Sequence, residues 1–169
     1  NLLELLRSEF IQHEVAALAA ILGDNGLALP FEKVDVLCRD LKLSNEQRGS
    51  LTWISRHYRA LTQAHLLKRS RLQPLLIDSA SHAAVQLLAA QAEVESALGP
   101  AVQACREFLS QPPEVRDPEP LIRGDDLLRL GLHPGPQFAR ILSEARSQQL
   151  DGEIKTEQQA LDLARDLAS

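Results

Sequence analysis

Apolar residues recur at helical spacing along almost the whole chain, and this periodicity limits the fold more than any other feature. In the first such stretch, Val15, Leu18, Ala19 and Leu22 follow an i, i+3, i+4, i+7 pattern that places them on one side of a helix. Aromatic residues make up only 4% of the chain, while Leu, Ala, Gln, Glu and Arg are abundant, a composition typical of packed helices. The sequence therefore predicts an all-α fold.

Turn and capping residues divide this pattern into separate helices. Residues 23–26 (GDNG) end the first helix, Pro30 opens the second, and Ser44 with Gln47 forms a capping box that starts the third. Further helices are expected from Lys68 or Ser70, over residues 81–98, and over residues 101–110. Gly99 and Pro100 are expected to form the break between the helices over residues 81–98 and 101–110.

A proline-rich segment, residues 111–119, predicts a boundary between two modules. Residues 111–120 contain four prolines, which should forbid helix and favour an extended spacer. We expect a helical bundle over residues 1–110 and a small three-helix module over residues 120–169. The module's expected signals are turns at Gly131 and Gly152, Pro136 at a helix start, and a capping box of Thr156 with Gln159.

The net charge of −5 conceals an uneven distribution of cations. Residues 47–77 contain no Asp or Glu but six cations, so the remainder holds 12 basic against 23 acidic residues, or −11. Clustered cations attract phosphates, but a solvated helix face whose cations pair with acids distant in sequence would show the same pattern. The candidate anion-binding residues are Arg48, Arg56, Arg59, Lys68, Arg69 and Arg71.

Two aromatic residues share the basic stretch. Trp53 and Tyr58 could stack on a nucleic-acid base, but Trp53 follows the apolar phase of Ile54, which favours the core. Cys38 and Cys105 are isolated thiols that we expect to be reduced and buried.

Several expectations concern the setting of the chain. No apolar run reaches the roughly 18 residues that span a bilayer, and no basic-then-apolar leader opens the sequence. We therefore expect a cytoplasmic protein with no membrane partner. The chain has no Met and begins inside a helical pattern, so its natural start is expected upstream.

Three ordered motifs in the C-terminal module resemble a known family. They read LIRGDDL at residues 121–127, LGLHPGP at residues 130–136, and QLDGEI at residues 149–154, followed by Thr156. In this order they resemble the C-terminal segment of the bacterial class II tRNA nucleotidyltransferase (CCA-adding) and poly(A) polymerase family. FIQHE at residues 10–14, LSNE at 43–46, ISRH at 54–57 and SRL at 70–72 are similar to the HD-type helical region that accompanies this family in many bacteria.

The resemblance implies that the chain is the helical body and tail of such an enzyme, with tRNA or another RNA as its partner. The head domain that transfers nucleotides would lie N-terminal in the same polypeptide, together with its Mg²⁺ and nucleoside triphosphates. No catalytic residue and no cofactor are then expected in this chain. Arg123, Arg140 and Arg146 could add a second phosphate contact beside the helix start after Pro136. The alternative for Arg123 and Arg140 is pairing with Asp125, Asp126 or Glu144.

The HD-type similarity raises the question of a metal site. His13 and His57 stand where two histidines of that family would be, but the chain lacks the His-Asp doublet, and Gln91 occupies the position of the late Asp. A glutamine lacks the charge that a hard cation needs, so we expect a vestigial site without metal.

Two alternative functions remain open at this point. A metal-dependent HD phosphohydrolase would hold a divalent ion at His13 and His57. A purely structural or dimerising helical module would bind no RNA and would form a homodimer through an apolar interface.

Overall fold

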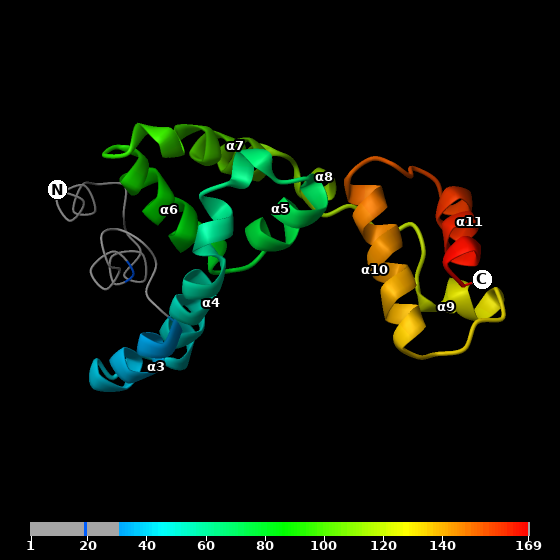
Figure 1. Cartoon of the computed structure of the whole chain (residues 1–169), viewed down its shortest axis with the longest axis horizontal. Coiled ribbons are helices and arrows are strands. Elements are labelled where there is room, and N and C mark those ends of the chain that lie inside the picture. Colours follow the sequence, from blue (N-terminus) through cyan, green and yellow to red (C-terminus); the bar gives the residue numbers. More distant parts are fainter. Residues whose placement is uncertain (1–18, 20–30, 169) are drawn as a thin grey trace. The chain divides into compact units, whose positions relative to one another are not determined.

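The computed structural model describes residue 19 and residues 31–168, and all regular secondary structure in them is helical (Figure 1). The all-α prediction is therefore confirmed. Val15, Leu18 and Leu22 lie outside the described residues. In the described part, no helix has both the length and the apolar character needed to cross a membrane.

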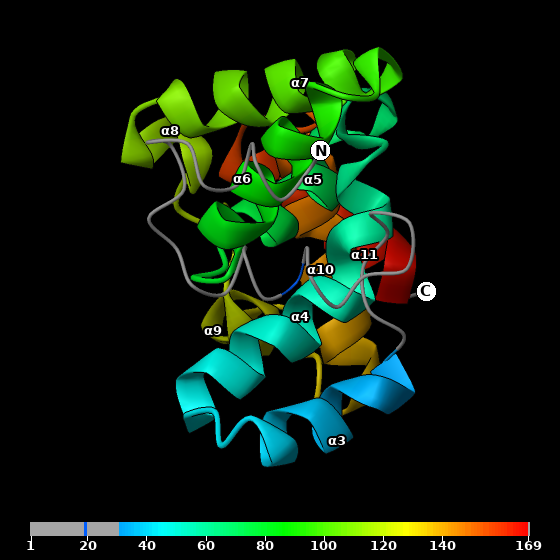
Figure 2. The same cartoon turned by 90° about the vertical axis from the view of Figure 1, so that its left-hand side faces the viewer.

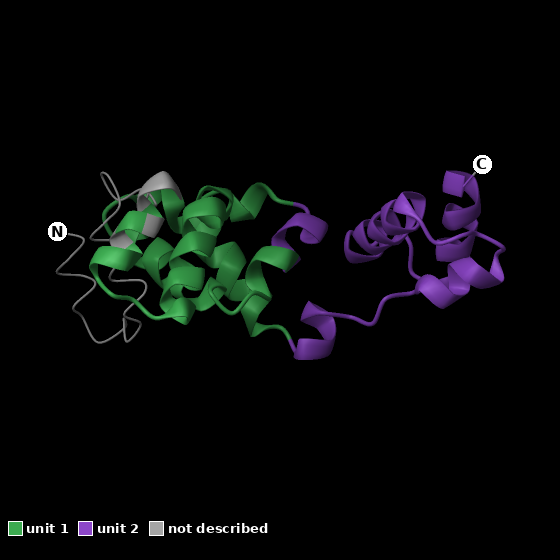
Figure 3. Ribbon diagram, turned by 90° about the horizontal axis from the view of Figure 1, so that it is seen from below, with its two compact units in different colours: residues 1–67, 74–111 green, residues 68–73, 112–169 purple. Residues whose placement is uncertain are grey.

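The described chain separates into two compact units, coloured in Figure 3. Unit 1 comprises residues 1–67 and 74–111, and unit 2 comprises residues 68–73 and 112–169. The first part of one helix, α5, thus belongs to unit 2 although it lies between the two segments of unit 1 in the sequence.

Unit 1 is built on α3 (Phe31–Asp40) and α4 (Asn45–Leu61), which pack against each other (Figure 2). The capping box that starts α4 is confirmed, since Ser44 Oγ accepts the Gln47 N–H at 3.2 Å and Gln47 Oε1 accepts the Ser44 N–H at 2.9 Å. The remaining helices of this part of the chain are η2 (Ala64–Leu66), α5 (Arg69–Leu76), α6 (Ser81–Ala92), η3 (Ser96–Leu98) and α7 (Gly99–Ser110).

The core of unit 1 lies where α6 packs against α4 and α7. Four residues of α4 at core spacing are buried together with the small residues of α6, which let the helices approach closely. Cys38 and Cys105 are buried thiols, as expected, and burial raises the pKa of Cys105 to about 11. The largest fully buried side chains of this core are Tyr58, Leu51, Ile54, Leu61, Leu87 and Leu88.

The structure corrects the expected helix over residues 81–98. This helix ends at Ala92, and α7 begins at Gly99 with Pro100 in its first turn. A proline lacks only an N–H that no helical carbonyl needs at that position, so it starts a helix as readily as it interrupts one.

The proline-rich segment is also less extended than expected. Pro113–Arg116 form α8, a single helical turn that follows the extended Pro112. Pro113 stands at the helix start, where proline is favoured, so the prediction that these prolines forbid helix was wrong.

Unit 2 contains three further helices that pack pairwise, α9 (Gly124–Arg129), α10 (Pro136–Leu150) and α11 (Glu157–Ala168). Its core consists of apolar residues from these helices and the segments before and between them: Ile122, Leu127, Ile141, Ala145, Ile154, Ala160 and Ala164.

Local chemistry sets the turns of unit 2 as the sequence predicts. Gly131 and Gly152 have φ of +81° and +75°, a left-handed conformation that favours glycine. After each glycine an N–H bonds back to the last turn of the helix, from Leu132 to the Leu127 carbonyl at 3.1 Å and from Glu153 to the Gln148 carbonyl at 2.8 Å. The capping box of Thr156 with Gln159 is likewise present.

Candidate nucleic-acid interface

Three of the predicted arginines lie together on α4. Arg48, Arg56 and Arg59 are separated by 8 and 3 residues, which at 3.6 residues per turn places them within about 80° of one another around the helix. All three are exposed, because the buried residues Leu51 and Ile54 fix the opposite side of α4 in the core. We call these three residues the α4 arginine face.

The sequence that carries this face contains few acids. Glu46 is the only acidic residue of α4, and residues 47–77 have none. Among the described residues, no carboxylate forms an ion pair with Arg59. A set of like charges on one exposed face produces a positive potential that attracts polyanions.

The other half of the basic stretch belongs to unit 2, where it contacts acidic and carbonyl groups. Lys68 Nζ lies 3.0 Å from Glu153 Oε1 and 3.9 Å from Asp151 Oδ2. The hydrogen bond and the charge of Glu153 raise the pKa of Lys68 above its usual range. The Arg69 guanidinium donates to the Val115 carbonyl, whereas Arg71 is exposed.

The arginines predicted in the C-terminal module also have protein contacts. Arg123 pairs with Glu119, and only its backbone N–H reaches Asp126, at 2.7 Å. Arg140 donates to the Leu167 carbonyl at 3.0 Å. The structure thus gives these two arginines partners other than those expected, Asp125, Asp126 and Glu144.

Arg146 is the most enclosed of these cations, with 23% of its side chain exposed. Its guanidinium donates to Asp117 Oδ1 at 2.6 Å, to the Pro118 carbonyl at 2.6 Å and to Gln149 Oε1 at 3.1 Å. These bonds attach the segment after α8 to α10.

Two of the motifs that carry the family resemblance meet within unit 2. The Ser70 N–H and hydroxyl both donate to the Asp151 carboxylate, at 2.8 Å each. A carboxylate at this position satisfies the first turn of α5, whose N–H groups have no helical partner. Sequence reasoning missed this pair because the two residues are 81 positions apart, and no local pattern connects them.

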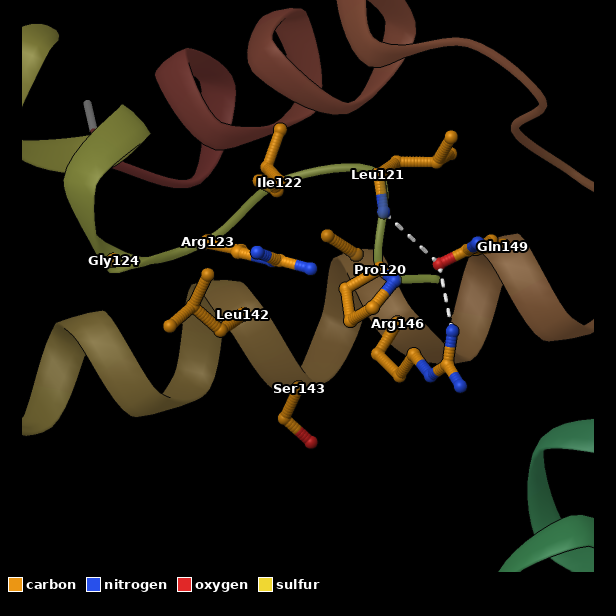
Figure 4. Close-up of a pocket in the computed structure, with 10 residues that line it drawn as sticks. Pro120, Leu121, Ile122, Arg123, Gly124, Leu142, Ser143, Arg146 and Gln149 are labelled. Carbon is orange, nitrogen blue, oxygen red and sulfur yellow. Dashed lines mark hydrogen bonds between the residues drawn. The ribbon is translucent and has the colours of Figure 1, made fainter. Parts of the chain in front are cut away.

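A shallow hollow of about 440 Å³ lies beside α10 in unit 2 (Figure 4). Pro120, Leu121 and Leu142 supply its apolar lining. Gln149 Oε1 already accepts the Leu121 N–H at 3.3 Å and one Arg146 donor, as the dashed lines show. These polar groups therefore serve to hold the segment before α9.

Of the two histidines predicted to mark a vestigial metal site, the structure describes only His57. His13 lies outside the described residues, and His57 is half-buried with its ring centroid 4.9 Å from that of Trp53. Within residues 31–168, no three His, Cys, Asp or Glu side chains lie close enough to hold a metal ion.

Gln91, at the position of the expected HD aspartate, has a packing role in the core. Its Oε1 accepts the Tyr58 hydroxyl at 2.6 Å, and both side chains are buried. Burial, with the nearby charge of Glu95, raises the pKa of Tyr58 well above its usual range. Of the two aromatic residues considered for stacking, Tyr58 is thus enclosed, whereas Trp53 is half-buried on the flank of α4.

Comparison with known proteins gives one match. The family model described as "tRNA nucleotidyltransferase domain 2 putative" matches residues 11–164. Searches of curated proteins and of solved structures each returned no significant match. Because the matched segment covers nearly all of the chain, the protein belongs to the tRNA nucleotidyltransferase domain 2 family.

Proposed function

We propose that the chain is the RNA-binding helical region of a tRNA nucleotidyltransferase or poly(A) polymerase, and that it positions RNA while a separate catalytic head adds nucleotides. Beyond the family membership, the observation that carries the proposal is the α4 arginine face. Guanidinium groups bind phosphates through charge and paired N–H donors without reading the bases. This mode of binding suits a protein that accepts RNAs of different sequence.

The proposal gives the cations of the two units different tasks. The α4 arginine face contacts RNA phosphates, whereas Lys68 and Arg146 hold unit 2 together through their carboxylate partners. Arg71, Arg123 and Arg140 are exposed and remain predictions for additional phosphate contacts.

Catalysis is assigned to the head. The nucleoside triphosphate and Mg²⁺ that the family resemblance implies would bind there, so the residues described here contribute by holding the RNA. Within the HD-like region, His57 is proposed to act as a packing partner of Trp53. No observation favours the phosphohydrolase alternative over this function.

The test is tRNA binding by the 169-residue chain, measured by fluorescence anisotropy of labelled tRNA at low salt. The triple variant Arg48→Ala, Arg56→Ala and Arg59→Ala should lose affinity by at least about tenfold, because several phosphate contacts disappear. A matched control, Arg106→Ala, Lys155→Ala and Arg165→Ala, removes the same charge from exposed positions outside the α4 arginine face. Circular dichroism should show that both variants remain folded.

Each outcome decides the proposal. Loss of affinity confined to the α4 variant supports it. Equal losses of affinity in both triple variants would show that binding depends only on net charge, and would contradict it. A wild-type chain that does not bind tRNA at low salt would contradict the proposal and favour the dimerising module.

A further inference from the structure

An aromatic pair flanks the α4 arginine face. Trp53 and His57 lie one turn apart on α4, with ring centroids 4.9 Å apart and ring planes inclined at 44°. Both side chains are half-buried, so part of each ring remains accessible. Trp53 is the only tryptophan of the chain.

The helix carries no side chain one turn before Trp53. Gly49 lies one turn before Trp53, on the side toward which helical side chains lean. Among the residues that the structure describes, none has a heavy atom within 4 Å of a Cβ placed on Gly49, so the space between them there is open. The His57 ring therefore supports the indole on its C-terminal side, while Gly49 places no side chain on its N-terminal side.

Charge lies next to this ring. Arg56 is exposed and follows Trp53 by three residues, which places it about 60° around the helix and one turn along it. An aromatic face beside an arginine matches an unpaired nucleotide, whose base stacks on the ring and whose phosphate pairs with the guanidinium. A base inside a duplex is already stacked and cannot use such a site.

We propose that Trp53, supported by His57, and Arg56 form a binding site for one unpaired nucleotide of the RNA. The site rests on the proposed RNA-binding function and adds to it a preference for RNA with unpaired bases. The α4 arginine face supplies affinity for any RNA backbone, and Trp53 makes binding stronger where a strand end or loop offers a free base.

Trp53 provides its own signal, because its fluorescence comes from one position in the chain. Titration with a short single-stranded RNA should quench the emission in step with binding measured independently by anisotropy of labelled RNA. A blunt-ended RNA duplex should bind with a much smaller change in emission. The comparison should be made at one salt concentration, since backbone affinity depends on salt.

Two variants separate stacking from folding. Trp53→Leu should weaken binding of the single strand by about tenfold and leave binding of the duplex unchanged, since only the stacked base is lost. Trp53→Phe keeps an aromatic face and should recover most of the loss. Thermal unfolding of each variant shows whether the half-buried position tolerates the change, and the wild-type quenching needs no variant at all.

The results also distinguish this proposal from the broader one. RNA binding that depends on the α4 arginine face but leaves Trp53 emission unchanged would overturn the nucleotide site and keep the proposed function. Equal losses on both RNAs in Trp53→Leu would likewise overturn the site, because they indicate a structural effect. Absence of any RNA binding would overturn both.

Discussion

Arg59 and Lys68 are close in sequence and carry the same charge, yet their surroundings differ. Arg59 lies on an exposed helix face whose helix contains one acid, Glu46. Lys68 lies beside Glu153 and Asp151, residues that only the tertiary fold brings near it. A run of cations in a sequence therefore gives the sign of a surface, and the fold decides which cations have carboxylate partners within their own unit.

The cations of unit 2 and the α4 arginine face also differ in exposure. The Arg146 side chain is 23% exposed and bonds three acceptors of unit 2, so it is the clearest structural cation. The α4 arginine face stands on the outer side of a helix whose inner side is closed by Leu51 and Tyr58. Changes in the unit 2 cations should therefore affect stability, and changes in the α4 arginine face should affect RNA binding.

The largest expected effect on stability is at Arg146. Arg146→Ala should lower the free energy of unfolding of unit 2 by about 2–3 kcal/mol, because it removes charge-assisted bonds to Asp117 and to the Pro118 carbonyl. Hydrogen exchange of the α10 amides measures this unit by itself. Arg59→Ala is the control and should change unit 1 stability by no more than about 0.5 kcal/mol. A larger loss of stability in Arg59→Ala than in Arg146→Ala would contradict the division into structural and RNA-binding cations.

The next effect concerns the buried side of α4. Tyr58→Phe should destabilise unit 1 by about 1.5 kcal/mol, because Gln91 Oε1 would keep its buried position without the 2.6 Å hydrogen bond. Denaturant unfolding followed by circular dichroism measures the loss. RNA affinity should stay the same, and a fall in affinity matching that of the arginine variants would show that the faces of α4 are not independent.

A smaller effect is expected at the contact between the motifs. Asp151→Ala should cost about 1 kcal/mol, the usual value of a helix N-terminal cap, because the Ser70 N–H and hydroxyl lose their acceptor. Hydrogen exchange should locate the change at the first turn of α5. Asp166→Ala, an exposed acid of α11, is the control; a similar loss there would mean that Asp151 acts only through net charge.

The smallest effect is that of Lys68, which pairs with Glu153 at the surface. Its pKa is higher in the folded chain, so the pair stabilises unit 2 below the usual lysine pKa of 10.5 and loses this effect as pH rises through the folded value. Lys68→Gln should therefore lower the stability of unit 2 at neutral pH in low salt, and this effect should vanish once the pH exceeds the folded pKa of Lys68 or in 1 M salt. An effect that persists in high salt would assign Lys68 a packing role.

The sequence predicts best those features that depend on neighbouring residues. Ser44 and Thr156 set helix starts through their own hydroxyls, and Gly131 sets a helix end through its positive φ. Prolines were less informative, because Pro100 and Pro113 are compatible with both a break and a helix start. Local patterns therefore gave the helices but not every boundary.

The candidate site was harder to predict because it depends on contacts distant in sequence. No pattern indicates that Asp151 caps α5 or that Arg146 holds Asp117. The phase of Trp53 with Ile54 suggested a core position, but Trp53 sits about 100° from Ile54 around α4, enough to leave it half-buried. The clustered charges in the sequence identified arginines and lysines as candidates. Only the fold separated the α4 arginine face from the cations that have partners in unit 2.

The most direct test is the salt dependence of tRNA binding, because its slope counts the phosphate contacts made by cations. The α4 triple variant should reduce the slope of log K against log salt by about two, whereas Lys68→Gln combined with Arg146→Gln should leave it unchanged. A slope that falls only when the unit 2 cations are changed would contradict the assignment of RNA contact to the α4 arginine face.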